Sequence, residues 1–365
     1  MYWKKLIQNS ITKVCQLPDR FNFNHQEIES ITSTYPMRIN PYYFGLIRYE
    51  NDPIWKQCIP DLKELDYSPD CSADPLHEEV DSPVPGLTHR YPDRLLLLIS
   101  DQCAMYCRFC TRKRKVGTPS LKITWKNFEK ALDYISNHSE VRDVILSGGD
   151  PLLLDDTRIE RILQKVREIP HVEIIRIGSR VPCTLPQRIT NELCEMLKNY
   201  HPLYLNTHFN HPWEITKEAF NACNLLANAG IPLGNQSVLL KGVNDDAETM
   251  KCLLQGLLRM RVRPYYIFQA DLVTGTNHFR TRVEKGLEIM SKTQGFTSGL
   301  AFPHYVIDSP GGGGKIPVMH KTILLMENGS IILRNYEGKI IHYPQTDIEE
   351  EKPPIKLLEV QKQIS

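Results

Sequence analysis

Ile99-Ser-Asp-Gln-Cys103-Ala-Met-Tyr-Cys107-Arg-Phe-Cys110-Thr-Arg-Lys-Arg-Lys115 is the stretch that decides the fold, because three cysteines follow an apolar run at C-x3-C-x2-C spacing. Three thiolates on one loop suit three irons of a [4Fe-4S] cluster and leave the fourth iron open to a small molecule. A structural zinc site needs a fourth ligand nearby, and residues 111–124 contain neither Cys nor His. The spacing therefore predicts an iron–sulfur loop in preference to a zinc site.

The composition indicates a chain that buries a large core and carries no excess charge. It has 365 residues, of which 41% are hydrophobic, and a formal net charge of +1. This length suits a barrel with terminal extensions, and the balanced charge gives no reason to expect a nucleic-acid or membrane partner. The ten cysteines are scattered apart from the triplet, and the first residues resemble neither a signal peptide nor a membrane span. We therefore expect a reducing, cytoplasmic setting.

Apolar runs and helical patterns alternate along the middle of the chain. The first run, Leu95–Ile99, is continuous, which is typical of a strand buried on both faces of a parallel sheet. Strand patterns follow at 141–147, 172–177, 203–206, 236–240 and 265–268, and helical patterns lie at 125–137, 159–169, 189–200, 215–229 and 248–260. This alternation predicts an α/β fold, a complete or partial parallel barrel of (β/α)6 type with right-handed crossovers.

The remaining segments are organised around this barrel. Residues 1–85 are polar with aromatic anchors, so we expect a mostly helical extension, ending in a linker at Cys71–Pro85 that lies over the surface. Residues 86–300 form the barrel, and 301–365 form a short C-terminal segment with a hairpin that turns at Asn328-Gly329. Functional groups of such a barrel lie at the carboxyl ends of its strands. Polar clusters occur there in the cysteine loop and at 148–150, 206–208 and 269–271.

A second signature is the loop Asp308-Ser-Pro-Gly-Gly-Gly-Gly-Lys315. Four glycines allow the backbone to approach a ligand closely and to adopt positive φ. The lysine that ends the loop could bind a phosphate, form a Schiff base, or be a solvated charge on a flexible turn. The loop lacks the form of a nucleotide-binding loop, because Ile316 follows the lysine where Ser or Thr would stand.

Several ordered motifs together carry a family resemblance. They are the cysteine loop with its basic continuation, and the segments 87–94, 147–151, 206–212, 234–240, 263–266 and 308–315. From about Val84 to Met319 the chain resembles the lysine 2,3-aminomutase family, whose members are radical S-adenosylmethionine (SAM) enzymes that also use pyridoxal 5'-phosphate (PLP). The resemblance implies a partial radical SAM barrel and an isomerase that moves the amino group of L-lysine to give β-lysine.

The resemblance also implies roles for individual residues. The [4Fe-4S] ligands would be Cys103, Cys107 and Cys110, and Lys315 would hold PLP as an internal aldimine. The PLP phosphate and ring would lie near Arg90, Arg94, Arg108 and Tyr91. The SAM side would be formed by Gly148, Gly149, Asp150, His208 and Gln236. The substrate carboxylate would pair with Arg112, and the distal ammonium with Asp271 and Asp308.

Simpler roles are open for some of these residues. Arg108 could be a solvated loop charge, and His208 and Gln236 could be core polar residues with satisfied hydrogen bonds. Asp271 could cap the following segment, and Asp308 could bind backbone in the glycine loop.

The chemistry explains why these parts belong together. Moving an amino group between adjacent carbons requires removal of hydrogen from an unactivated carbon, which a carbon radical can do and a side-chain base cannot. PLP then stabilises the rearranging radical, and SAM is regenerated as a cofactor. We accordingly expect lysine as the substrate, a reducing electron donor such as flavodoxin or ferredoxin, and a homo-oligomer.

The chain departs from the family at a structural zinc site. The best-known members place one cysteine in the helix after the segment that here is 242–245, and three cysteines near the C-terminus. This chain has Asp246 and Ala247 at that helix start and no cysteine after Cys252, so zinc is not predicted. Besides a free-lysine aminomutase, two alternatives stay open. They are the related enzyme that makes β-lysine for elongation factor P, and a metal-binding or nucleic-acid module using residues 112–115.

Overall fold

A computed structural model describes residues 1–118, 123–319, 322–327 and 330–344. The chain divides into two compact units, Met1–Val318 and Met319–Ser365. The first unit contains the sheet that was predicted as a barrel together with the loop that carries Lys315.

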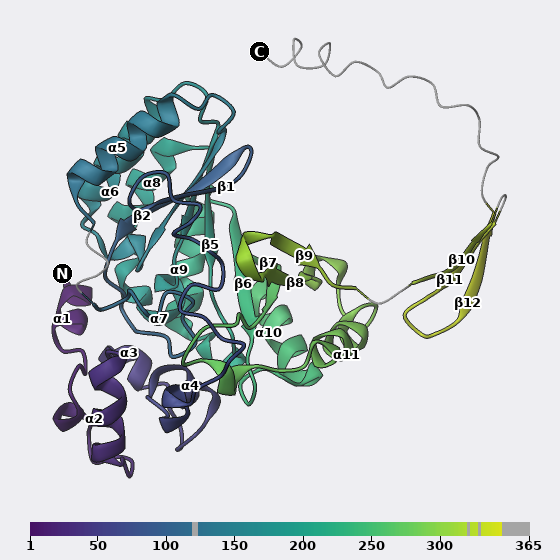
Figure 1. The fold of residues 1–365 in the computed structure, drawn as a ribbon, viewed down its shortest axis with the longest axis horizontal. Helices are drawn as coiled ribbons and strands as arrows, with labels where there is room; N and C mark the ends of the chain where they lie inside the picture. The colour runs from purple at the N-terminus through teal and green to yellow at the C-terminus, as the bar shows by residue number, and fades with distance from the viewer. Residues whose placement is uncertain (119–122, 320–321, 328–329, 345–365) are drawn as a thin grey trace. The chain divides into compact units, whose positions relative to one another are not determined.

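The first unit is built on one nine-stranded sheet whose strands follow each other in chain order (Figure 1). The strands are β1 Leu87–Tyr91, β2 Arg94–Ser100, β3 Asp143–Gly148, β4 Ile174–Gly178, β5 Leu203–Thr207, β6 Leu233–Leu239, β7 Val262–Gln269, β8 His304–Ser309 and β9 Gly314–Pro317. Strands β2 to β8 run parallel, while β1 and β9 are antiparallel to their neighbours. The two edges meet, because the backbone N–H of Lys315 on β9 donates to Tyr91 Oη on β1 at 3.0 Å. The sheet is therefore a nearly closed, mostly parallel barrel.

The six predicted strands are confirmed as β2 to β7, but the sheet extends further than predicted. A seventh parallel strand, β8, pairs with β7, and the antiparallel strands β1 and β9 were not predicted. Strand β1 is Leu-Thr-His-Arg-Tyr, with one buried residue and four half-buried ones, so it lacks the apolar run that marks β2. Strand β9 has only four residues and begins inside the glycine loop. Both edge strands form because a distant strand supplies their hydrogen bonds, which local sequence does not reveal.

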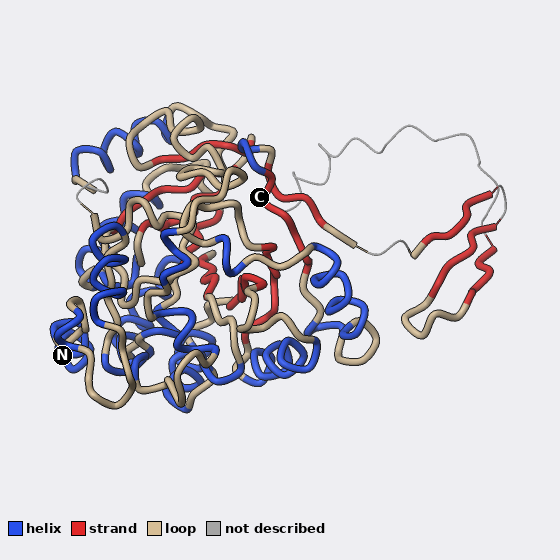
Figure 2. The backbone as a smooth tube through the Cα atoms, turned by 60° about the horizontal axis from the view of Figure 1, so that its bottom comes forward, coloured by secondary structure: helices blue, strands red, loops and turns tan. Residues whose placement is uncertain are grey.

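Helices pack along the outside of the strands (Figures 1 and 2). They are α5 Trp125–Ser136, α6 Asp156–Arg167, α7 Val181–Thr184, α8 Asn191–Leu197, α9 Lys217–Asn228, α10 Ala247–Arg259 and α11 Val283–Thr293. Each long helix buries one apolar stripe, as α10 does with Leu253, Leu254 and Leu257. The Asp246 side chain caps α10 by accepting from the N–H of Thr249 at 2.8 Å. None of the helices in the described ranges combines the length and apolar character that a membrane crossing requires.

The N-terminal extension contains helices, but they are short. They are α1 Tyr2–Gln8, α2 His25–Thr34, α3 Pro41–Phe44 and α4 Pro53–Cys58, with 3-10 turns and loops between them. Proline at the first position and an Asn or Asp cap start both α3 and α4. From 66 to 86 the extension forms no helix, so the prediction of a mostly helical segment overstated its regular structure. Many Asp, Ser and Pro residues in 66–86 favour turns over helix.

The carboxyl ends of the parallel strands bring the predicted polar loops to one edge of the barrel, as expected. Two of these loops are in backbone contact, because the N–H groups of Gly149 and Asp150 donate to the carbonyls of Ser100 and Gln102, both at 2.6 Å. A Cβ at Gly148, whose φ is 140°, would lie 2.1 Å from the Ser100 carbonyl oxygen. Glycine at this position is therefore required for the loop after β3 to lie against the cysteine loop.

The second unit contains a three-stranded antiparallel sheet of β10 Ile323–Glu327, β11 Ser330–Arg334 and β12 Ile340–Pro344. The hairpin predicted for residues 323–334 is confirmed as β10 and β11. Its predicted turn at Asn328-Gly329 and the tail after 344 lie outside the described residues.

Candidate active site

The centre of the candidate site is Lys315, at the start of β9. Strand pairing places Lys315 opposite Asp308 on β8, and Lys315 Nζ lies 2.9 Å from Asp308 Oδ2. Tyr91 on β1 contacts Lys315 and Arg94. Its Oη accepts from the backbone N–H of Lys315, and the Arg94 guanidinium stacks on its ring at 3.9 Å. The structure thus brings together four residues, from β1, the start of β2, β8 and β9, that the resemblance had assigned to the site.

Arg90 lies beside this group. Its Nε donates to Asp81 Oδ2 at 2.9 Å, its Nη2 donates to the Leu76 carbonyl, and its Nη1 lies 3.8 Å from Asp308 Oδ1. Arg94 pairs with Asp93 at 2.7 Å and keeps 36% of its side chain exposed. Two arginines with accessible donors therefore lie near the amine of Lys315, a combination that suits an anion such as a phosphate.

Asp271 and Asp308 each leave one carboxylate oxygen buried without a hydrogen-bond partner, the Oδ1 atom in both residues. Burial, together with the charges of Asp308 and Glu78 and against the opposing charge of Lys315, raises the pKa of Asp271 to about 7. Buried carboxylate oxygens are normally paired. Two buried oxygens that accept no hydrogen bond, with Arg90 no nearer than 3.8 Å to the one on Asp308, indicate that a cationic or hydrogen-bond-donating ligand belongs there.

Arg112, which follows the cysteine triplet, forms a two-pronged ion pair with Glu78. Nε and Nη2 of Arg112 donate to the two carboxylate oxygens of Glu78 at 3.0 and 2.7 Å. Burial alone would raise the pKa of Glu78, but the charges of Arg112, Arg114 and Lys115 together, with the hydrogen bonds from Arg112, lower it. Both partners are therefore charged, and Glu78 approaches Asp271 closely enough to influence its ionisation.

The cysteine loop carries Cys103, Cys107 and Cys110, all of them half-buried with free thiols. Arg180, at the end of β4, donates through Nη1 to Cys107 Sγ at 2.8 Å. These residues fit an iron–sulfur cluster, because three cysteine sulfurs lie on one loop and the Arg180 guanidinium beside them stabilises negative charge on sulfur. In the described ranges, however, no three Cys, His, Asp or Glu side chains are gathered in a metal-holding arrangement.

Arg108 does not share the partners of Arg90 and Arg94. It is buried, and its guanidinium donates to both carboxylate oxygens of Glu64 and to the carbonyls of Pro36 and Tyr35. The residue is therefore no solvated loop charge, and binding a PLP phosphate would first require breaking this buried pair. The signal that the sequence offered, a basic residue inside the cysteine motif, does not distinguish these roles.

On the predicted SAM side, Asp150 is already fully engaged. Its carboxylate accepts from Ser179 Oγ at 2.6 Å and from the N–H groups of Arg180, Val181 and Leu152 at 2.8 to 3.1 Å. Burial raises its pKa to about 6, although these hydrogen bonds oppose the shift. Asp150 therefore fixes the end of β4 against the loop after β3, which is a positioning role.

His208 and Gln236 lie on neighbouring elements. His208 follows β5, its Nε2 is 3.0 Å from Asn210 Oδ1, and its ring is 5.5 Å from that of Phe109 in the cysteine loop. Burial and then the charge of Arg180 lower its pKa to about 3, so the ring is neutral. Gln236 is half-buried on β6. The contact between His208 and Phe109 shows that the β5 loop reaches the cysteine loop, as the predicted SAM role requires.

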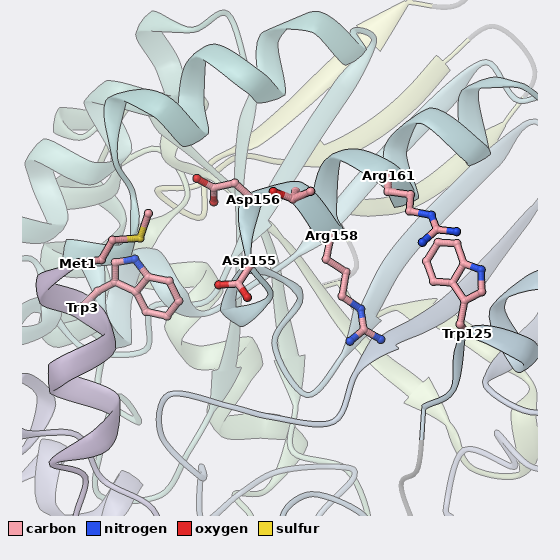
Figure 3. Close-up of a pocket in the computed structure, with 8 residues that line it drawn as sticks. Met1, Trp3, Trp125, Asp155, Asp156, Arg158 and Arg161 are labelled. Atoms are coloured by element: carbon pink, nitrogen blue, oxygen red, sulfur yellow. The ribbon is translucent and has the colours of Figure 1, made fainter.

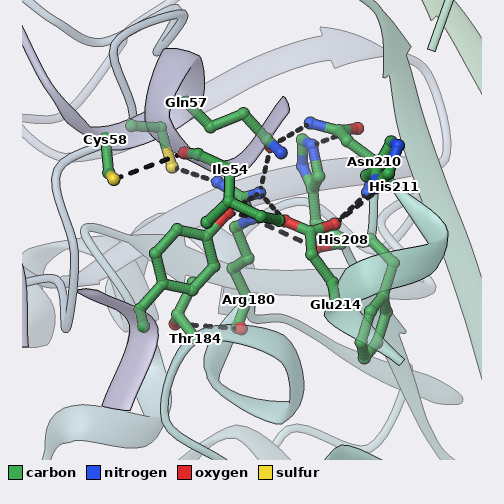
Figure 4. Close-up of polar contacts among 12 residues, drawn as sticks. Ile54, Gln57, Cys58, Arg180, Thr184, His208, Asn210, His211 and Glu214 are labelled. Atoms are coloured by element: carbon green, nitrogen blue, oxygen red, sulfur yellow. Dashed lines mark hydrogen bonds and ion pairs between the residues drawn. The ribbon is translucent and has the colours of Figure 1, made fainter. Parts of the chain in front are cut away.

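Sequence reasoning missed a buried polar network around Arg180 (Figure 4). Arg180 Nη2 donates to Glu214 Oε1 at 2.8 Å and to Gln57 Oε1 at 2.6 Å, and Tyr43 Oη donates to the same Glu214 oxygen at 2.6 Å. The second oxygen of Glu214 accepts from the N–H groups of Asn210 and His211. The one available signal was the position of Arg180 after the third predicted strand, since polar residues at strand ends often serve the site.

A pocket of about 820 Å³ opens elsewhere in the first unit, between α1 and the start of α6 (Figure 3). Its described lining includes Trp3, Asp155 and Arg158, and Arg161 stacks over Trp125 at 3.9 Å. None of the lining residues is one of the predicted site residues.

Comparisons with known proteins agree with this geometry. Residues 97–253 match the model of the Radical SAM superfamily, and residues 290–355 match that of Lysine-2,3-aminomutase. The L-lysine 2,3-aminomutase of Fusobacterium nucleatum is 53% identical, over 94% of this chain and 82% of its own. That of Clostridium subterminale is 53% identical over 94% and 84%, respectively. The glutamate 2,3-aminomutase of Clostridioides difficile is 46% identical over 93% and 81%.

Among solved structures, coproporphyrinogen III oxidase of Escherichia coli covers 57% of this chain and 53% of its own at 17% identity, with a TM-score of 0.39. This likeness carries none of the argument. The relatives and the two family models are decisive: the chain belongs to the lysine 2,3-aminomutase family of radical SAM enzymes.

Proposed function

We propose that this protein converts L-lysine to β-lysine by moving the α-amino group to the adjacent carbon, using a [4Fe-4S] cluster, SAM and PLP. The observation that carries the proposal is the pair of buried carboxylate oxygens on Asp271 and Asp308 that accept no hydrogen bond, next to Lys315. The oxygen of Asp308 has only a long ion-pair contact, with Arg90 at 3.8 Å. A ligand with a cationic end satisfies both oxygens. The family relatives named for lysine support the same substrate.

The protein's own side chains supply binding and orientation. Cys103, Cys107 and Cys110 would hold the cluster, and Lys315 would hold PLP with Arg90 and Arg94 toward its phosphate. When bound, these groups supply a carbon radical that removes hydrogen and a conjugated system that stabilises the migrating centre. Tyr91 fixes the backbone of Lys315 through its hydroxyl, which orients the lysine amine.

Charge pairing decides the substrate in this proposal. A lysine ammonium that leaves water for this site is stabilised by about 4 kcal/mol for each close carboxylate, before desolvation, at an effective dielectric constant of about 20. Two carboxylates therefore favour a cationic side chain and repel an anionic one such as that of glutamate. Arg112, paired with Glu78 at the cysteine loop, is the proposed partner of the substrate carboxylate.

The direct test is anaerobic incubation of the reconstituted protein with L-lysine, SAM, PLP and a strong reductant, which replaces a flavodoxin- or ferredoxin-type donor. We expect β-lysine as the product. Formation of β-glutamate from L-glutamate, with no β-lysine from L-lysine under the same conditions, would overturn the proposal.

A further inference from the structure

The segment at 72–81, here named the strap, is fastened to the loops of the candidate site. Sequence analysis placed it in a surface linker. In the structure the N–H of Ser72 donates to the carbonyl of Leu272 after β7 at 2.8 Å, and the N–H of Gly311 in the glycine loop donates to the carbonyl of Pro75 at 2.8 Å. Farther along, Asp81 pairs with Arg90 at 2.9 Å. The strap therefore belongs to the site's framework.

Between these anchors the strap presents Glu78 to Arg112. His77 takes a positive φ of 53°, which turns the chain directly before Glu78, and the N–H of Glu78 donates to Asp74 Oδ1 at 3.2 Å. The side chains of Glu78 and Arg112 are only 15% and 14% exposed. Glu78 is therefore held by its backbone, and the pair is largely protected from water.

The geometry of the pair leaves one end of the Arg112 guanidinium available. Glu78 occupies the edge formed by Nε and Nη2. Among the residues that the structure describes, Nη1 makes two long contacts, 3.4 Å to Ser147 Oγ and 3.5 Å to the Gly148 carbonyl. A guanidinium binds carboxylates through either of its two-nitrogen edges, so a second carboxylate can approach the end formed by Nη1 and Nη2.

We propose that Glu78 is a positioning residue: it locks the guanidinium of Arg112 and presents the Nη1 and Nη2 end to the α-carboxylate of the amino-acid substrate. This inference rests on the proposed function, in which Arg112 reads that carboxylate. A free arginine side chain loses conformational freedom when it binds, and the strap supplies that ordering before the substrate arrives. Holding a contact residue by an outer partner is a general way to fix its geometry.

The test compares Glu78→Gln with Glu79→Gln. Glu79 is the next residue on the strap, but its carboxylate pairs with Lys115 and Arg114, so Glu79→Gln is a matched control. We expect Glu78→Gln to raise the KM for L-lysine about ten- to hundredfold with a smaller change in kcat, the size seen when an outer partner of a ligating side chain is lost. Glu79→Gln should change KM by less than about twofold, and Glu78→Asp, which keeps the charge, should recover part of the loss.

A second measurement isolates the carboxylate. 1,5-Diaminopentane is lysine without its carboxylate, so its inhibition constant should be nearly the same in wild type and Glu78→Gln. An equal loss of affinity for lysine and for diaminopentane would overturn the inference, because the residue would then act on the whole site. A lower KM in Glu78→Gln would also overturn it, since Glu78 would then compete with the substrate for Arg112.

These outcomes are distinct from failure of the proposed function. If wild-type enzyme makes no β-lysine, the proposed function fails. If wild type is active and Glu78→Gln has an unchanged KM and an unchanged melting temperature, only the role of Glu78 fails. Should Glu78→Gln melt much lower than wild type, the KM values of both proteins are compared at a temperature where Glu78→Gln stays folded.

Discussion

Two polar regions of this molecule differ in how completely their charges are paired. Around Arg180, the carboxylate of Glu214 accepts four hydrogen bonds, and the guanidinium donates to Glu214, Gln57 and the sulfur of Cys107. Around Lys315, Asp271 and Asp308 each keep a buried oxygen that accepts no hydrogen bond. Both regions lie in the first unit.

This difference in hydrogen bonding distinguishes charged residues that hold the fold together from charged residues that bind a ligand. A buried ion pair with every lone pair satisfied holds segments together, here β4, the β5 loop and the N-terminal extension. A buried carboxylate with an unpartnered oxygen costs stability, so its presence indicates a ligand that completes it. By the same reasoning Arg108 holds the fold together, because its guanidinium donates hydrogen bonds to Glu64 and to backbone carbonyls.

The largest expected effect lies at Lys315. Replacing Lys315 with Ala removes the amine proposed to hold PLP, so activity should fall about 10³-fold or more. Borohydride reduction followed by peptide mapping measures the covalent label, which should be on Lys315 in wild type and absent in Lys315→Ala. Lys292→Ala, an exposed lysine on α11, is the control. A stoichiometric label on another lysine in Lys315→Ala would show that the assignment is wrong.

A substitution in the fully paired network around Arg180 should lower the stability of the protein. Glu214→Ala leaves the Arg180 guanidinium buried without its carboxylate, so the free energy of unfolding should fall by about 3–5 kcal/mol, or about 6–12 °C in melting temperature. Thermal unfolding of the apoprotein measures this. Glu195→Ala, which removes an exposed partner of Lys198, should change stability by less than about 1 kcal/mol. Equal melting temperatures for the two variants would contradict the structural role.

The ionisation of Asp271 should make activity rise with pH and should make the contribution of this residue to stability fall with pH. Its pKa of about 7 means that kcat/KM for lysine should rise with pH through about 7, and below that should fall about tenfold per pH unit. A folded-state pKa raised above the unfolded value of about 3.9 makes this carboxyl's contribution to stability decline as pH rises from about 4 to about 7. Asp271→Asn should lose the inflection in kcat/KM. A pH profile that keeps it in the variant would assign it to another group.

The smallest effect is expected at a capping carboxylate. Asp246 accepts from the N–H of Thr249 at the start of α10, so Asp246→Ala should cost about 1 kcal/mol of unfolding free energy. The KM and kcat for lysine should stay unchanged, because this carboxylate has its partner within the helix. Urea unfolding and steady-state kinetics measure both. A loss of activity at unchanged stability would mean that carboxylates with satisfied partners also serve the reaction.

The sequence was sufficient for the parts of the fold that local patterns determine. Strands β2 to β7 carry apolar runs, and the helices between them carry 3.6-residue periodicity, so their order and the parallel barrel could be predicted. The cysteine loop could also be placed at a strand end, because it directly follows the apolar run of β2. The glycine loop could be identified from its composition, but not the strand β8 that precedes it. Strand β1 could not, since its polar residues become a strand only by pairing with β2.

The residues that hold the site together could not be predicted either, because their partners are distant in the sequence. Glu78 lies in a stretch of Asp, Glu, Ser and Pro, and nothing local indicates that it meets Arg112, 34 residues away. Glu64 and Glu214 resemble ordinary surface glutamates until the fold buries them against Arg108 and Arg180. Pairing across long stretches of chain is a property of the tertiary structure, which single-sequence patterns do not encode.

The most direct test of the account is the ratio of kcat/KM for L-lysine to that for L-norleucine, which has the same chain length and no terminal amine. If Asp271 and Asp308 bind the side-chain ammonium of lysine, wild type should favour lysine over norleucine by about 10⁴ to 10⁵-fold, because norleucine offers both carboxylates no cation. In Asp271→Asn and Asp308→Asn the ratio should fall at least about tenfold. A wild-type ratio below about ten, or losses below about threefold in both variants, would show that these carboxylates do not read the substrate.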